Sequence, residues 1–179
     1  HVSKLSHRKN PWCLLNAFGE LSAAEATRDV SLVLAVSGWK NDEVLSFAKA
    51  RNLSDKIVFT GFTPEEDVVG LYNGAEAFVF PSRAEGFGMP NVEAMACGCP
   101  VVTTRAFAIP EIVGDAALVI DDPEDYRAVA GALSRILSDP ALRSSLAERG
   151  LERARSFSWE KSARTILDVY SSLVPRVRP

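Results

Sequence analysis

Two glutamates flank a glycine-rich stretch of the sequence, and their spacing suggests a binding site. Glu85 and Glu93 have seven residues between them, among them Gly86 and Gly88. Carboxylates accept hydrogen bonds from hydroxyl groups such as those of a sugar. The glycines let the backbone approach a ligand closely, and the N–H groups at the start of the helix expected from Pro90 can donate to anionic oxygens. The stretch therefore predicts a site for sugar hydroxyls and a phosphate.

A purely structural explanation of this stretch stays open on the residues alone. Glycine-rich turns between a strand and a helix are common in α/β proteins, and this one matches neither the full dinucleotide-binding fingerprint nor the P-loop. Glu93 would then only interact with the positive end of a helix dipole, and Glu85 would be a solvated loop residue. The pair of carboxylates at one crevice favours the functional interpretation.

A basic segment precedes the first expected helix. Lys4–Lys9 comes directly before Asn10, the expected N-cap, and Pro11, the expected first helical residue. Positive side chains beside a helix N-terminus can hold a pyrophosphate, with His7 as a minor candidate. The alternative is a solvated basic loop.

Two other clusters are better explained without a metal ion. Asp122 as N-cap, with Pro123 at the first helical position, accounts for the acidic run Asp121–Asp125. Cys97 and Cys99 lie too close together in the sequence for a standard zinc half-site. We therefore expect no metal and no other cofactor.

Short apolar runs alternate with helical patterns along the chain, and the runs are apolar on both faces. This pattern predicts a parallel sheet covered by helices on each side. The expected strands span residues 31–36, 56–60, 77–80, 100–104 and 116–120, with residues 1–5 as the tail of another strand. The expected helices begin after Asn10 and at 41–51, 65–73, 90–97, 123–137, 140–153 and 159–173. We predict a Rossmann-like, doubly wound α/β fold with a parallel sheet of about six strands, which binds ligands at the carboxyl ends of its strands.

The bulk properties of the chain narrow its partners. Its 179 residues suit one domain, and a net charge of −3 gives no general attraction to nucleic acids or anionic membranes. No apolar run approaches the ~20 residues that span a bilayer. The three cysteines form no C-x-x-C pair and fit free thiols in a reducing compartment. We expect a cytoplasmic location and no nucleic-acid partner, with any membrane association arising outside this chain.

The stretch from Phe80 to Val102 resembles the donor-site motif of the glycosyl transferases group 1 family, in which seven residues also separate two glutamates. The resemblance continues in order through residues 55–64, 71–75, 110–117 and 157–160, so it covers nearly the whole chain. It implies that residues 1–179 form the single C-terminal, donor-binding domain of a retaining glycosyltransferase of the GT-B fold. The N-terminal acceptor domain would be absent from this chain.

The resemblance also implies roles for the charged residues. Glu93 would hold the ribose of the nucleotide, and Glu85 would lie beside the transferred sugar. Lys9 would neutralise the leaving diphosphate, so Glu85 and Lys9 are the candidate catalytic residues. Lys4 stands where the family usually has an arginine, and it keeps the charge but loses the bidentate fork.

The remaining candidates are backbone and aromatic groups that would contact the donor. Loop amides would meet sugar hydroxyls and phosphate oxygens, although Pro90 has no N–H to offer. Gly61 and Phe62 would flank the base. The candidate donor-binding residues are Lys4, Gly61, Phe62, Gly86, Phe87, Gly88, Met89, Pro90, Asn91 and Glu93.

The implied activity belongs to a longer protein. The whole enzyme would move a sugar from a nucleoside diphosphate to an acceptor hydroxyl, without a metal and with the anomeric configuration retained. This chain alone would be inactive, because the acceptor site lies on the missing domain. The alternatives are a non-catalytic nucleotide-sugar binding module and a related two-domain enzyme, such as a nucleotide-sugar epimerase or a phosphorylase. The sequence names neither the base and sugar nor the acceptor glycan or lipid, and polysaccharide biosynthesis is the expected setting.

Overall fold

The strands of the computed structural model, which describes residues 1–173, all run parallel. One sheet pairs β1 with β2, and in the other β4 lies between β3 and β5. The predicted strands are confirmed to within one or two residues, because two-sided burial leaves a continuous apolar run that is visible in the sequence. The strands are β1 (Leu32–Ala35), β2 (Ile57–Gly61), β3 (Phe78–Phe80), β4 (Val101–Thr104) and β5 (Ala117–Ile120).

The first residues of the chain lie between the two sheets. Val2 forms a parallel bridge with Ala35 of β1, and the Ala35 amide donates to the His1 carbonyl at 2.9 Å. On the other side, His1 Nδ1 lies 2.8 Å from the carbonyl oxygen of Val79 in β3. The predicted single sheet of about six strands is therefore replaced by two sheets with a short segment between them. That segment pairs only near Ala35, so it does not join β1 to β3 along their length.

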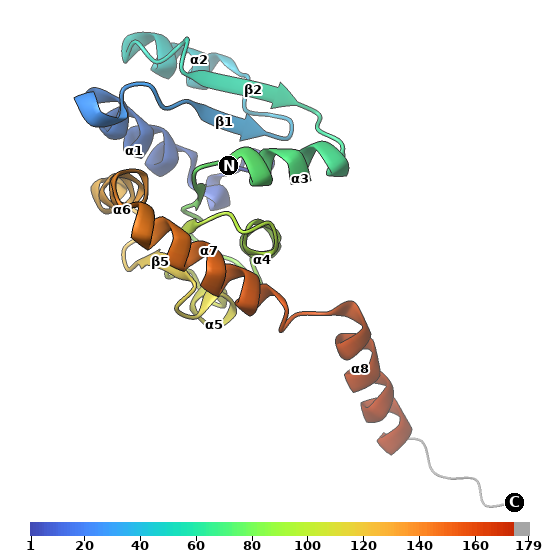
Figure 1. The fold of residues 1–179 in the computed structure, drawn as a ribbon. Helices are drawn as coiled ribbons and strands as arrows, with labels where there is room; N and C mark the ends of the chain where they lie inside the picture. Colours follow the sequence, from blue (N-terminus) through green and yellow to red (C-terminus); the bar gives the residue numbers. More distant parts are fainter. Residues whose placement is uncertain (174–179) are drawn as a thin grey trace, which may run out of the picture.

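Helices cover both faces of the sheets (Figure 1). In β3, Phe78 and Phe80 enter one apolar core, while Val79 enters the other. The Val79 core is covered by α1 (Pro11–Ala23) and α6 (Tyr126–Ser138), and the phenylalanine core by α4 (Met89–Ala96), while α7 (Pro140–Ala154) contributes residues to both. The other helices are η1 (His7–Lys9), η2 (Glu25–Thr27), α2 (Asp42–Ala50), α3 (Glu65–Gly74), α5 (Ile109–Val113) and α8 (Trp159–Leu173).

The predicted start of α6 is wrong by three residues. Asp125, not Asp122, is the N-cap and accepts from the Ala128 amide at 2.9 Å. Asp122 instead accepts from the amide of Glu124 at 2.9 Å, which closes a turn. Tertiary contacts hold this turn outside the helix, because Asn10 Nδ2 donates to the Pro123 carbonyl at 2.6 Å.

The start of α1 also differs from the expectation, because no side chain caps it. Asn10 does precede the helix and Pro11 does begin it, as predicted. However, Asn10 has a left-handed backbone with φ of 55° and makes no capping hydrogen bond. Its side chain instead donates to the Pro123 carbonyl in the turn before α6. It therefore links two loops and does not cap the helix.

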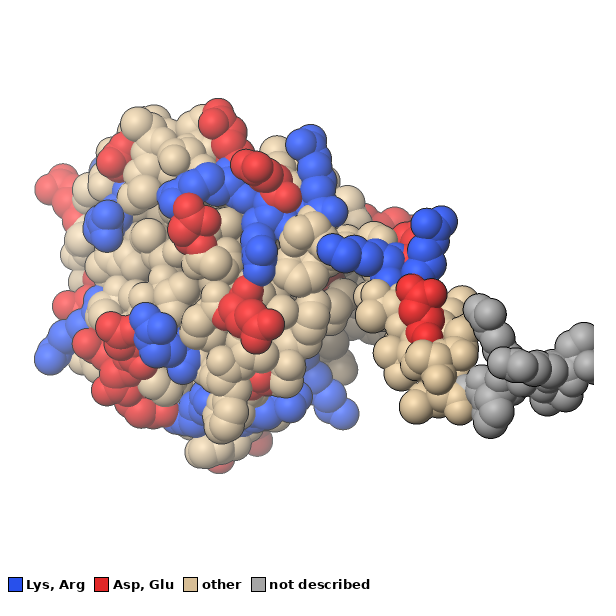
Figure 2. Space-filling view, turned by 90° about the horizontal axis from the view of Figure 1, so that it is seen from below, with Lys and Arg blue, Asp and Glu red and all other residues tan. Residues whose placement is uncertain are grey.

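Helix α8 projects away from the rest of the described chain (Figure 1). The helical spacing of Trp159, Ile166, Leu167 and Tyr170 predicts a packing stripe, but these side chains are exposed, with 78% of Trp159 and 62% of Tyr170 accessible. Figure 2 shows this arm extending from a face on which side chains of both charges are interspersed. Within residues 1–173, no helix combines the length and the apolar character needed to cross a membrane.

Candidate functional site

The predicted site residues come from segments that follow the strands. Gly61 ends β2 and Glu85 follows β3, while Lys9 belongs to η1, which follows the segment beside β1. Glu93 lies in α4, the helix after β3. Because the strands are parallel, these segments meet at the carboxyl edge, where doubly wound sheets bind ligands.

Lys9 and Glu85 form a buried ion pair. The Lys9 Nζ lies 2.6 Å from Glu85 Oε1, and only 13% and 8% of the two side chains are exposed. The same oxygen accepts from Ser82 Oγ at 2.9 Å. Removing one partner of such a pair leaves a buried charge uncompensated and costs about 3–5 kcal/mol. The structure thus brings together the two residues predicted to be catalytic.

This pair retains capacity to bind a ligand. Both contacts to the carboxylate use Oε1, so Glu85 Oε2 can accept a hydrogen bond from a hydroxyl group. The Lys9 ammonium carries three N–H groups and also lies 4.5 Å from the centre of the Phe80 ring. An anion and a sugar hydroxyl could therefore be held on adjacent sides of one ion pair.

Arg83 holds the basic segment against the Glu85 loop, a role that no local pattern in the sequence predicts. Its amide donates to the Arg8 carbonyl at 2.9 Å, and its guanidinium donates to the His7 carbonyl at 2.6 Å. The guanidinium also makes a bidentate contact with Glu124. This hydrogen bonding lowers the pKa of Glu124 below its usual value. Arg83 therefore positions Lys9 through the backbone of η1.

Gly88 allows the glycine-rich loop to pass close to its neighbours. It has φ of 85° at the N-cap of α4, a left-handed conformation that favours glycine. A Cβ there would lie 2.9 Å from Asn91 Nδ2 and 3.3 Å from Ile109 Cγ1. A larger residue would therefore both strain the backbone and displace the side chains that support the loop.

The amides of this loop differ in their availability. The Asn91 amide donates to the Gly88 carbonyl at 2.9 Å, so it is already engaged. Within residues 1–173, the amides of Phe87, Gly88 and Met89 have no protein acceptor. Of the amides predicted to bind the donor, these three remain free to meet an anion at the N-terminus of α4.

Asn91 contributes a buried amide side chain without a partner. The residue is fully buried, and neither its Oδ1 nor its Nδ2 bonds to any group within residues 1–173. An unsatisfied buried polar group costs about 1–3 kcal/mol. Such an uncompensated group beneath a glycine-rich loop is typical of a site rather than of a structural turn.

Glu93 is oriented by Tyr72 of α3. The buried Tyr72 hydroxyl donates to Glu93 Oε2 at 3.1 Å. Burial, together with the nearby Glu93 charge, raises the pKa of Tyr72, so the phenol remains a donor at neutral pH. The exposed Glu93 carboxylate keeps Oε1 for a ligand. Tyr72 lies in one of the stretches that carry the family resemblance, but its partner is 21 residues away, so its role could not be read locally.

Lys4, Gly61 and Phe62 lie at the same edge without joining this cluster. Lys4 is exposed. Gly61 has φ of 69°, and the Phe62 side chain is 86% exposed. Among the described residues, no hydrogen bond or ion pair links the three to Glu85 or Glu93. Their predicted contacts with the donor remain predictions.

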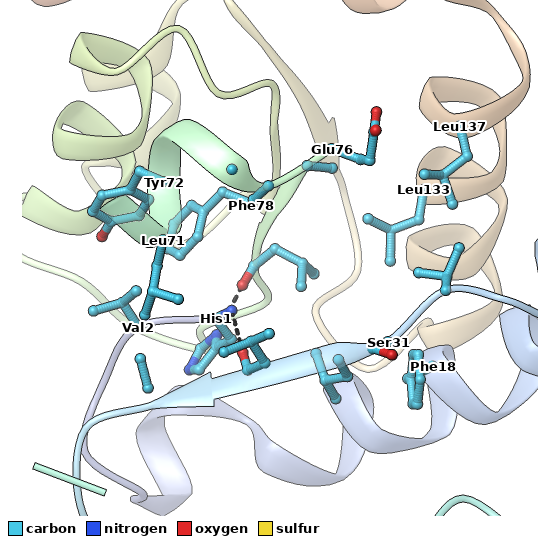
Figure 3. Close-up of a pocket in the computed structure, with 18 of the residues that line it drawn as sticks. His1, Val2, Phe18, Ser31, Leu71, Tyr72, Glu76, Phe78, Leu133 and Leu137 are labelled. Atoms are coloured by element: carbon cyan, nitrogen blue, oxygen red, sulfur yellow. Dashed lines mark hydrogen bonds between the residues drawn. The ribbon is translucent and has the colours of Figure 1, made fainter. Parts of the chain in front are cut away.

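A further cavity of the described chain lies elsewhere. It has a volume of about 470 Å³ and occupies the gap between β1 and β3 (Figure 3). Its lining includes His1, Phe18 of α1, and Leu133 and Leu137 of α6. The lining is mainly apolar and includes none of the predicted site residues, although Tyr72, which orients Glu93, is part of it. We therefore regard it as a break in the sheet and place the site at Glu85.

Residues 1–153 match the family model described as glycosyl transferases group 1. O-antigen chain mannosyltransferase B of Escherichia coli is 35% identical over 173 residues, which are 97% of this chain and 45% of that protein. The chain thus spans less than half the length of this curated relative.

Solved structures confirm the doubly wound α/β fold. The sucrose-phosphate synthase of Thermosynechococcus elongatus matches with a TM-score of 0.83 and 28% identity, over 96% of this chain and 44% of that one. Anabaena HepE, solved in complex with UDP-glucose, matches with a TM-score of 0.84 and 23% identity, over 97% of this chain and 48% of that one. At this level of identity, the HepE match shows a shared fold only.

Proposed function

The chain belongs to the glycosyl transferases group 1 family, and on this basis we propose that it is the C-terminal, donor-binding half of a retaining glycosyltransferase. The observation that carries the proposal is the buried Lys9–Glu85 pair. It puts a cation suited to a diphosphate beside a carboxylate suited to a sugar. The 35% identical mannosyltransferase supports a hexosyltransferase acting in polysaccharide assembly.

Each part of the donor has a counterpart in the proposed site. Glu93 accepts from the ribose hydroxyls and is oriented by Tyr72. The free amides of residues 87–89 and the dipole of α4 stabilise the diphosphate. Glu85 accepts from hydroxyls of the transferred sugar. Gly61 and Phe62 flank the base.

The chemical step follows from where charge develops. As the glycosidic bond breaks, negative charge grows on the leaving diphosphate. Lys9, the loop amides and the more distant Lys4 stabilise this charge in place of a divalent ion. Loss of one such donor raises the barrier by roughly 2.7–4 kcal/mol, by analogy with oxyanion holes. Attack by the acceptor on the same face of the sugar retains the anomeric configuration, so Glu85 is not assigned as a covalent nucleophile.

Calorimetric titration tests donor binding directly. The purified chain is titrated with UDP, GDP and ADP and with UDP-glucose, GDP-mannose and ADP-glucose, without added metal. We expect one nucleotide to bind selectively and Glu93→Ala to weaken both that nucleotide and its sugar conjugate. Glu152→Ala, at an exposed position of α7, is the matched control and should bind like the parent. Equal binding by Glu93→Ala and Glu152→Ala would contradict the proposal.

The isolated chain should bind donor without transferring the sugar. The acceptor site and any general base lie on the other half of the proposed enzyme. Incubation with radiolabelled sugar nucleotide and a panel of glycan acceptors should therefore yield no labelled product, whereas the full-length protein should yield one. Transfer by the purified chain alone would overturn this prediction.

A further inference from the structure

The loop between β4 and α5 carries a residue that the proposed roles do not explain. Phe107 has φ of 51°, a left-handed conformation that residues with a Cβ rarely adopt. Its side chain is 82% exposed, so the core does not require the ring. An aromatic residue that is both strained and exposed suggests a function.

The loop is anchored beside the Glu85 ion pair. The amide of Ala108, the next residue, donates to the Glu85 carbonyl at 3.4 Å. Ile109 follows and is fully buried, with its side chain packed against Gly88. These contacts fix the backbone that follows Phe107 against Glu85 and Gly88 of the glycine-rich loop. Phe107 is therefore fixed relative to Glu85, although its ring faces solvent.

An open hollow separates the Phe107 loop from the basic segment. It has a volume of about 320 Å³, which falls at the lower end of the roughly 300–1,000 Å³ typical of small-molecule sites. Its lining includes one aromatic, one acidic and one basic residue. The residues that line it are Arg8, Ala84, Glu85, Gly86, Phe107 and Ala108.

We propose that Phe107 is a specificity-determining residue that packs against the pyranose ring of the donor sugar. One face of a pyranose presents C–H groups, which pack on an aromatic ring, while the hydroxyls at its rim bond to polar groups. In this hollow, Glu85 and Arg8 supply the polar groups and Phe107 supplies the flat apolar surface. The inference rests on the proposed function, because it adds a contact to the sugar part of the same site.

The test compares the affinity for the sugar nucleotide with that for the bare nucleoside diphosphate. Phe107→Gly and Phe107→Asn remove the ring, and both residues tolerate a positive φ, so neither variant should lower the melting temperature of the chain. Phe107→Trp keeps an aromatic surface. The probes are UDP-glucose with UDP, GDP-mannose with GDP, and ADP-glucose with ADP.

We expect the two variants without the ring to bind the sugar nucleotide roughly three- to tenfold more weakly and the bare nucleotide as tightly as the parent. Phe107→Trp should retain the parent's affinity for both. Unchanged binding of the sugar nucleotide by Phe107→Gly and Phe107→Asn would overturn the inference, including the case in which the ring serves only an acceptor sugar.

Failure of the proposed function gives a different result. In that case neither form of any nucleotide binds the parent chain, or Glu93→Ala binds as tightly as the parent. Such a result would overturn the role of Phe107 as well. Weakened binding by Glu93→Ala with no effect at Phe107 removes the present inference and leaves the donor site intact.

Discussion

At the scale of single residues, the candidate site depends on side chains that hold its two glutamates. Lys9 and Ser82 hold Glu85, and Tyr72 holds Glu93. The two glutamates could be singled out from the sequence, because their spacing on either side of a glycine-rich loop is visible locally. Lys9 could be singled out as well, but its pairing with Glu85 and the role of Tyr72 could not, because folding alone brings Lys9 from 76 residues away and Tyr72 from 21.

Tyr72→Phe should weaken nucleotide binding through Glu93. The substitution keeps the buried ring and removes the hydrogen bond that orients the carboxylate. We expect the affinity for the nucleotide to fall roughly two- to tenfold, which corresponds to one hydrogen bond. Calorimetric titration measures this change. Adding Tyr72→Phe to Glu93→Ala should cause no further loss, because the phenol then has no carboxylate to orient. A full additional loss in the double variant would mean that Tyr72 acts independently.

At the scale of secondary structure, sequence patterns were reliable where burial is continuous and failed where short segments take their shape from distant contacts. The apolar run at Val101–Thr104 and the Pro140 helix start are both correct because each signal is local. Helix α5 was missed, since five residues hold too little of a helical repeat to show a period. The start of α6 was misplaced because Arg83 and Asn10 hold the preceding turn from outside.

Helix α8 should contribute little to the stability of the domain. Its apolar side chains, such as Trp159 and Tyr170, are exposed in the described chain, and an isolated 15-residue helix is marginally stable. A chain ending at Ser158 should melt within about 2 °C of the full chain in a thermal denaturation experiment, and it should be more soluble. Leu146→Ala is the contrasting variant, because truncating that fully buried side chain should lower the free energy of unfolding by about 2–5 kcal/mol. A large fall in melting temperature on truncation would show that α8 packs against the body in solution.

At the scale of the whole molecule, the two sheets are connected only by the short segment at the start of the chain, which pairs with β1 near Ala35. His1 is buried where the sheets meet, and its imidazole nitrogens lie 2.8 Å from the Val79 carbonyl oxygen and 2.7 Å from Ser3 Oγ. The cavity of about 470 Å³ lies along the same gap. The candidate site is built mainly on the three-stranded side, but Lys9 reaches it from η1, which follows this connecting segment. Substitutions that remove the buried His1 imidazole should therefore lower the stability of the whole domain.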